Sequence, residues 1–148
     1  TFPLMAGDTW ESSVILDAAK GKNIQVYVST FFDENDNNAV AADFVSGFKA
    51  WLNANSDKLT NNGGNDIVAA VSALGFDAYN VALAAITAAD SADPAAIAEA
   101  LPGVVFENAV TGSISFDENG DANKTRAYIK YANLETGAFD FVKTQSVN

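Results

Sequence analysis

The segment from Asp66 to Ala89 constrains the fold more than any other part of this 148-residue chain. Apolar residues recur at helical spacing along two sides of it. One stripe holds Val71, Leu74, Ala78, Val81 and Ala85, and the other holds Phe76, Tyr79, Leu83 and Ile86. A helix that is apolar on both sides is predicted to be buried over most of its circumference, so other elements must cover it. Asn65 stands where it could cap the first amides of this helix.

Strand and helix patterns alternate before this segment. A short apolar run from Phe2 to Ala6 predicts a strand, Glu11 to Ala19 has helical spacing, and Ile24 to Ser29 alternates with period two. The polar segment from Asp33 to Asn38 is predicted to be a solvated loop that begins the next helix. That helix places Ala41, Phe44, Phe48 and Trp51 at spacings of 4, 4 and 3, which predicts a core-facing stripe.

The pattern changes from helix to strand after Gly103. Asp93 and Pro94 are typical of a helix start, while Pro102 and Gly103 stop that helix after Leu101. Strands are then predicted from Gly112 to Phe116, from Thr125 to Tyr131 and from Ala138 to Val142, the last two forming a hairpin. The sequence therefore predicts one α/β domain without internal repeats that ends in a β-hairpin. We see no apolar run approaching the ~20 residues that span a bilayer.

Composition excludes several classes of function. Cysteine and histidine are absent, so disulfides, the usual zinc sites and histidine-based catalytic triads cannot be built from this chain. The net charge of −11 disfavours nucleic acid and anionic membranes as partners. We expect neither a cofactor nor a metal.

The acidic segment from Asp117 to Asp121 resembles the opening of a calcium-binding loop. Ala122 and Tyr128 replace the glycine and the glutamate that an EF-hand requires at those positions. Because Asn119 and Gly120 form a common turn pair, we interpret the segment as a turn. Asp33, Asn35 and Asn37 share the spacing and the same defects, so we do not expect a metal there either.

Asp8 and Trp10 follow the first predicted strand, at the edge where open α/β sheets place ligand contacts. The residues alone favour Asp8 as a helix N-cap. Trp10 is equally suited to anchor a core or to form an apolar pocket wall.

Four blocks together resemble a known family. They are LMAGDTWESS (Leu4 to Ser13), LGFDAYNVALAAI (Leu74 to Ile86), DPAAIAEAL (Asp93 to Leu101) and TGSISFDENGD (Thr111 to Asp121). In this order they resemble the C-terminal portion of the type I periplasmic binding proteins, most closely the branched-chain amino-acid group. The resemblance implies a truncated Rossmann-like fold, three layers of sheet and helices, in which ligand lies between two lobes.

The same resemblance divides the chain between those lobes. Residues 1–30 and 125–148 would belong to the C-terminal lobe and residues 31–124 to the N-terminal lobe. The implied function is that of the substrate-binding protein of an ABC transporter for branched-chain or related amino acids, with the transporter permease as partner. The implied location is periplasmic or extracellular, with or without a lipoprotein anchor on the parent protein.

The resemblance also gives expectations for the binding site. It implies that Asp8 binds the α-ammonium group of the ligand and that Trp10 lies beside it. Val71 would lie near the ligand where the family has an aromatic residue, and this departure leaves the identity of the ligand open. The groups that bind the ligand carboxylate would come from the N-terminal half, which has no counterpart in this chain.

Three further expectations follow. Uncovered sheet edges and apolar helix faces predict that the chain forms a dimer. A ligand-sensing domain of a receptor or regulator is the alternative function, because it can use the same two-lobed module. An α/β enzyme using Asp8 and Asp77 is a third alternative, disfavoured because an acid, base and nucleophile set is missing.

Overall fold

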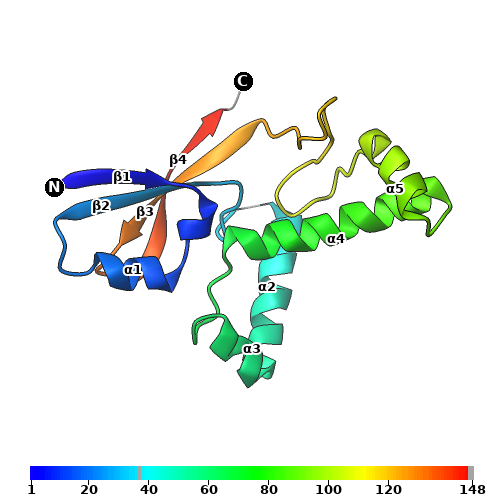
Figure 1. Cartoon of the computed structure of the whole chain (residues 1–148). Helices are drawn as coiled ribbons and strands as arrows, with labels where there is room; N and C mark the ends of the chain where they lie inside the picture. Colours follow the sequence, from blue (N-terminus) through cyan, green and yellow to red (C-terminus); the bar gives the residue numbers. More distant parts are fainter. Residues whose placement is uncertain (37, 147–148) are drawn as a thin grey trace.

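The computed structural model describes residues 1–36 and 38–146, and its centre is a four-stranded mixed sheet (Figure 1). The strands are β1 (Phe2–Ala6), β2 (Ile24–Thr30), β3 (Arg126–Asn133) and β4 (Ala138–Ser146), in that order across the sheet. β1 and β2 are parallel, whereas β2–β3 and β3–β4 are antiparallel. The predicted α/β class and the C-terminal hairpin are therefore confirmed.

Helix α1 (Ser13–Ala19) links β1 to β2 and covers one face of the sheet. It follows a 3-10 turn, η1 (Asp8–Trp10). A strand alternates its side chains between two faces, and the even-numbered residues of β2 and β3 point toward α1. This first core contains the buried residues Leu16, Ala19, Val26 and Ala132.

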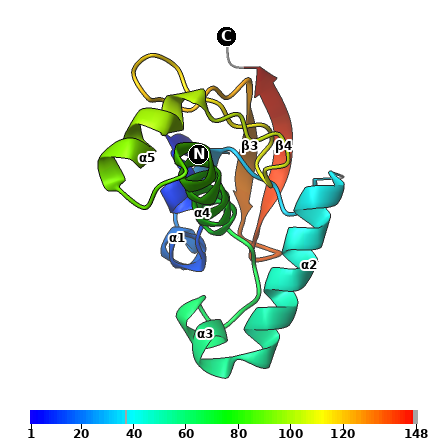
Figure 2. The same ribbon diagram turned by 90° about the vertical axis from the view of Figure 1, so that its right-hand side faces the viewer.

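The remaining helices extend away from the sheet (Figures 1 and 2). They are α2 (Ala39–Ala54), α3 (Ser56–Asn61), α4 (Ala70–Ala89), α5 (Pro94–Ala100) and the 3-10 turn η2 (Leu101–Gly103). Asn38 caps α2 and Asp93 caps α5, each through side-chain hydrogen bonds to backbone amides. The cap expected from Asn65 is wrong because α4 begins at Ala70, and Asn65 instead accepts a bond from the amide of Ile67.

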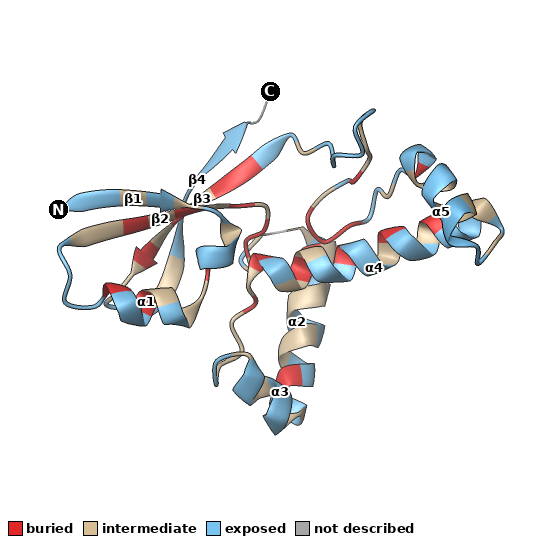
Figure 3. Cartoon of the chain, in the orientation of Figure 1, coloured by how far each residue is buried: buried red, intermediate tan, exposed pale blue. Residues whose placement is uncertain are grey.

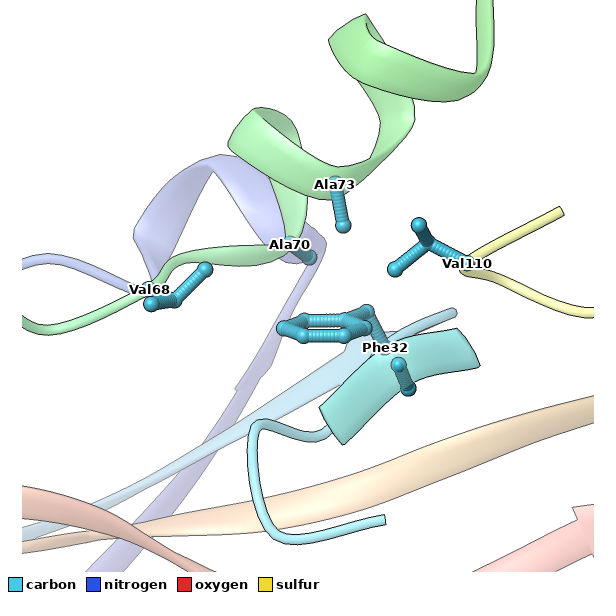
Figure 4. Close-up of a cluster of buried hydrophobic side chains, with 6 residues drawn as sticks. Phe32, Val68, Ala70, Ala73 and Val110 are labelled. Atoms are coloured by element: carbon cyan, nitrogen blue, oxygen red, sulfur yellow. The ribbon is translucent and has the colours of Figure 1, made fainter. Parts of the chain in front are cut away.

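A second core joins the helices to the end of β2. Phe32 lies at its centre, surrounded by Val68, Ala70, Ala73 and Val110 (Figure 4). A third core lies along α4, where Val81 and Ala85 pack against the segment from Val104 to Ile114.

A buried carboxylate fixes that segment to α4. Asp77, which is 1% exposed, accepts hydrogen bonds from the amides of Val110 and Thr111, both at 2.8 Å, and from the Thr111 hydroxyl at 2.7 Å. This network supplies partners for backbone groups that would otherwise be buried without any.

The strand expected from Gly112 to Phe116 is wrong. Only isolated bridges form there, between Phe106 and Ile114 and between Phe116 and Ala122. The turn at Asp117 is confirmed, since its carboxylate accepts bonds from the amides of Asn119 and Asp121.

The prediction that α4 is buried around most of its circumference is also wrong. In the first stripe Val81 and Ala85 are buried, but Val71 and Ala78 are exposed. In the second stripe Phe76, Tyr79, Leu83 and Ile86 are 40–64% exposed. Figure 3 shows buried and exposed positions alternating along the helix. Helix α2 reaches one end of the second stripe, where the Phe44 ring lies 4.9 Å from that of Phe76 between centroids.

Contrary to the sequence prediction, α4 is also long and apolar enough to cross a membrane by length and composition alone. One helix of this kind is weak evidence for a membrane span, because core helices of soluble proteins have the same length and apolar composition.

Candidate functional site

A hollow of about 300 Å³ lies between the segment that follows β1 and the loop that precedes α4. Its first wall runs from Asp8 to Leu16, and its second is formed by residues between Asn61 and Val71, with Phe139 of β4 also contributing. The surface that lines the hollow is mostly apolar, although both walls also carry polar residues. Their side chains are those of Asp8, Thr9, Glu11, Ser12, Ser13, Asn61, Asn62 and Asn65.

The two walls approach each other closely at Gly63. This residue has a φ of +84°, and a Cβ placed on it would lie 3.0 Å from the Ser13 hydroxyl oxygen. A larger side chain would therefore be strained by its backbone and would press on the opposite wall. Asn62 holds the loop in shape by donating to the carbonyls of Asn65 and Ile67.

The structure brings together two of the three residues predicted for the site. Asp8 and Val71 line the hollow from opposite walls, although they are far apart in sequence. Trp10 does not line it and is 40% exposed, so it is not a core anchor. Asp8 begins η1, and its side chain does not act as the N-cap that the residues alone favoured.

The sequence analysis missed the most buried charged group of the hollow, Glu11. Its side chain lies at the base, where one carboxylate oxygen accepts a hydrogen bond from the Lys130 ammonium at 2.5 Å. The other oxygen lies 3.4 Å from both the Thr30 hydroxyl and the amide of Ala70. Glu11 thus contacts β2, β3 and the first residue of α4 at once.

Lys130 also contacts a second carboxylate, that of Asp33, at 3.5 Å. Glu11, Asp33 and Lys130 are all buried, and together they carry one net negative charge. The prediction that Asp33 lies in a solvated loop is wrong, because Lys130 provides a partner inside the protein. Asn37, the last residue of that predicted loop motif, lies outside the described residues.

Burial raises the pKa of Glu11 above its ordinary value, while the neighbouring Lys130 ammonium acts in the opposite direction. Removal of water disfavours the charged form more than the single ammonium favours it. A further cation at this carboxylate would stabilise the ionised form.

One signal in the sequence could have revealed this cluster. Lys130 lies between Tyr128 and Ala132 on one face of β3, and all three are buried. A lysine on the buried face of a strand requires a carboxylate partner. The pattern does not say which of the 19 acidic residues supplies it.

Two acidic residues, Asp8 and Glu11, line the hollow. Carboxylates are the side-chain groups that accept hydrogen bonds from an ammonium group. Among residues 1–36 and 38–146, no group of three or more acidic side chains is placed to hold a metal ion.

No protein-family model and no curated protein matches the chain in sequence. Solved structures do match it. A leucine-binding protein, LivK, from Thermotoga maritima is 29% identical with a TM-score of 0.74, and the match covers 96% of this chain and 37% of LivK.

Two further structures show the same likeness. An ABC transporter substrate-binding protein from Desulfitobacterium hafniense, in complex with Leu, is 24% identical with a TM-score of 0.63, covering 96% of this chain and 36% of that one. The solute-binding protein of an ABC transporter from R. palustris, in complex with benzoate, is 16% identical with a TM-score of 0.61, covering 90% and 34%.

The chain has the fold of the type I periplasmic binding proteins, and the resemblance identified in the sequence is confirmed. It spans a little over a third of the length of each of these structures. The first of them is described as a leucine-binding protein, and the other two as the substrate-binding or solute-binding proteins of ABC transporters.

Proposed function

We propose that this chain is part of the extracytoplasmic substrate-binding protein of an ABC transporter, with branched-chain or related amino acids as ligands. The observation that carries the proposal is the acidic hollow, lined by Asp8 and Glu11, in a chain 29% identical to a leucine-binding protein. The transporter permease is the protein partner that this function requires. A lipoprotein anchor on the parent protein would be compatible with the same function.

In this proposal the two walls of the hollow belong to two lobes. Residues 1–30 and 125–148, which contain the sheet and α1, form part of one lobe. Residues 31–124, which contain α2 to α5, form part of the other, and the chain crosses near Phe31 and near Ala122 to Thr125. A ligand that contacts both walls would bind best when they are close together and would thereby favour a closed arrangement.

The chemistry of the walls suits the cationic end of an amino acid. Asp8 is half-buried and accessible, whereas Glu11 is buried at the base with Lys130 on one of its oxygens. An ammonium group added beside them would bring the net charge of the buried cluster closer to zero. We propose that Asp8 and Glu11 together bind the α-ammonium group and that Val71 contacts the ligand side chain.

The described residues do not offer a matching cationic group for the ligand carboxylate at this hollow, because Lys130 is held by Glu11 and Asp33. We therefore expect the 148-residue chain to bind leucine with a dissociation constant of about 1 mM or weaker, roughly the 4 kcal/mol of a single anchored group.

The test is an amide NMR titration of the chain with leucine, isoleucine and valine. Shifts are expected at residues lining the hollow, including Asp8, Glu11 and Val71. Leucine amide, which keeps the ammonium and loses the carboxylate, is expected to bind as well as leucine. 4-Methylpentanoate, which lacks the ammonium, is expected to produce no shifts.

Two variants assign the ammonium contact. Asp8→Asn and Glu11→Gln are each expected to weaken the leucine shifts, whereas Asp17→Asn on the exposed side of α1 is a matched control that leaves them unchanged. Binding of 4-methylpentanoate equal to that of leucine would refute the ammonium role. Micromolar affinity of the chain for leucine would refute the proposal that it holds only part of the site.

A further inference from the structure

One face of β3 carries polar side chains that bind the segment following β2. Arg126, Tyr128 and Lys130 alternate along the strand and therefore point to the same side of the sheet. Their partners are two carboxylates that lie between β2 and α2, those of Asp33 and Asp36. Figure 2 shows this segment beside β3. We call these five residues the β3 ladder.

Asp36 joins β3 to the start of α2. One oxygen of its carboxylate accepts a hydrogen bond from the Tyr128 hydroxyl at 2.6 Å and lies 3.5 Å from the Arg126 guanidinium. The other oxygen accepts a bond from the amide of Asn38, the residue that caps α2. Burial acts to raise the pKa of Asp36, but the bonds from Tyr128 and Asn38 outweigh it and hold the pKa below its ordinary value. These contacts therefore stabilise the ionised carboxylate.

Asp33 is bound in the same way at the next position of the ladder. One of its oxygens lies 3.5 Å from the Lys130 ammonium, and the other accepts a bond from the amide of Asn35 at 2.8 Å. The same ammonium binds Glu11, whose second oxygen lies 3.4 Å from the amide of Ala70. Since Ala70 is the first residue of α4, directional polar contacts connect β3 to both α2 and α4.

The ladder fixes orientation in a way that the neighbouring core does not. The core around Phe32 holds the helices near the sheet by burial of apolar surface, which is a non-directional effect. Hydrogen bonds to charged groups are stronger than neutral ones and weaken steeply when their angles change. A rotation of the helices relative to β3 would break the contacts of Asp33 and Asp36 together, because both carboxylates lie on the segment that leads to α2.

We propose that the β3 ladder sets the orientation of helices α2 to α5 relative to the sheet and thereby the width of the hollow. The hollow has one wall on each of these two parts, residues 8–16 and residues 61–71. No member of the ladder lines the hollow, so these are positioning residues that hold the walls at the spacing at which one ligand contacts both. The inference rests on the proposed function only in taking the hollow as the ligand site.

Distance measurements between two spin labels test the proposal. The chain has no cysteine, so Asp17→Cys on α1 and Ser46→Cys on α2 place one label on each part at exposed positions. Double electron–electron resonance of the ligand-free chain is expected to give one narrow distance distribution. Tyr128→Phe combined with Arg126→Gln removes the contacts between β3 and Asp36 and is expected to replace the narrow peak with a broader distribution.

Lys49→Met is the matched control. It removes the 2.9 Å ion pair with Glu34, which like Lys49 lies in residues 31–124, and is expected to leave the distribution unchanged. Circular dichroism shows whether the helices are retained, and Tyr128→Phe alone, which removes one hydroxyl group, takes the place of the double variant if that variant does not fold.

An unchanged distribution in the folded ladder variant, or equal broadening by Lys49→Met, would overturn the proposal. The comparison is made without ligand and so does not depend on the proposed function. A labelled chain whose distances do not respond to leucine would count against the proposed function, while the difference between the ladder variant and the control would still decide the role of the ladder.

Discussion

Replacement of Lys130 by methionine is the sharpest test of the buried charge cluster beneath the hollow. Methionine keeps the unbranched apolar part of the lysine side chain and removes only the ammonium group. Glu11 and Asp33 then lose the cation that lies 2.5 Å from one and 3.5 Å from the other. Both carboxylates stay buried, with only neutral donors around them.

The expected effect follows from the burial of all three groups. Breaking a buried ion pair by removing one partner lowers the free energy of unfolding by about 3–5 kcal/mol, because the remaining charge has no compensation. The double variant Lys130→Met/Glu11→Gln removes one of the stranded charges. It is expected to lose about 1–3 kcal/mol less than the sum of the two single variants.

The effect also depends on pH in a defined direction. Burial raises the pKa of Glu11 above 4.5, so between that pH and the folded-state pKa the folded protein holds a proton that the unfolded chain releases. The free energy of unfolding therefore falls as pH rises through this window. Loss of Lys130 raises the pKa of Glu11 further, so the deficit of Lys130→Met should be largest at neutral pH and shrink toward pH 4.5.

Urea denaturation followed by circular dichroism measures these differences. Lys20→Met is the matched control, since Lys20 forms an exposed pair with Asp17 at 2.6 Å and its loss should change stability by less than about 0.5 kcal/mol. The reasoning is refuted if Lys130→Met loses clearly less than about 3 kcal/mol at neutral pH, the lower limit for breaking a buried pair. A deficit independent of pH would refute the assigned role of Glu11.

Two other buried contacts give independent predictions. Asp77→Ala leaves the amides of Val110 and Thr111 without an acceptor and should lower the free energy of unfolding by at least about 2 kcal/mol. Hydrogen exchange at those two amides should accelerate, and unchanged protection would contradict this role. Burial and the bond to the Asp36 carboxylate raise the pKa of Tyr128 to about 12, so its contribution to stability is present below pH 10 and lost as pH rises toward 12. An ultraviolet absorbance titration should show a step near 12 that Tyr128→Phe removes, and its persistence in that variant would contradict the assignment.

Local patterns predicted most elements of the fold. Asp93 and Pro94 start α5 as expected because an N-cap carboxylate and a proline act on neighbouring amides. The hairpin of β3 and β4 followed from the two strand patterns, and the turn at Asp117 followed from the neighbouring pair Asn119 and Gly120. The strand predicted from Gly112 to Phe116 does not form, since residues of this segment make only isolated β-bridges.

The candidate site was predicted only in part. Asp8 and Val71 came from the family resemblance, and the structure places both in one hollow. Glu11 was missed because its surroundings are contributed by Thr30, Ala70 and Lys130, which lie 19 to 119 residues away in the chain. No local pattern carries that information.

The sequence by itself determined the α/β class, the boundaries of the capped helices and the amphipathic character of α4, since each depends on residues a few positions apart. Only the tertiary structure decided which stripe of α4 is covered and which charges are buried together. Periodicity shows that Phe76, Tyr79, Leu83 and Ile86 form an apolar stripe, but burial requires a second surface. The described residues bury Val81 and Ala85 and leave Tyr79, Leu83 and Ile86 exposed, because the segment from Val104 to Ile114 packs against the side of the helix that carries Val81 and Ala85.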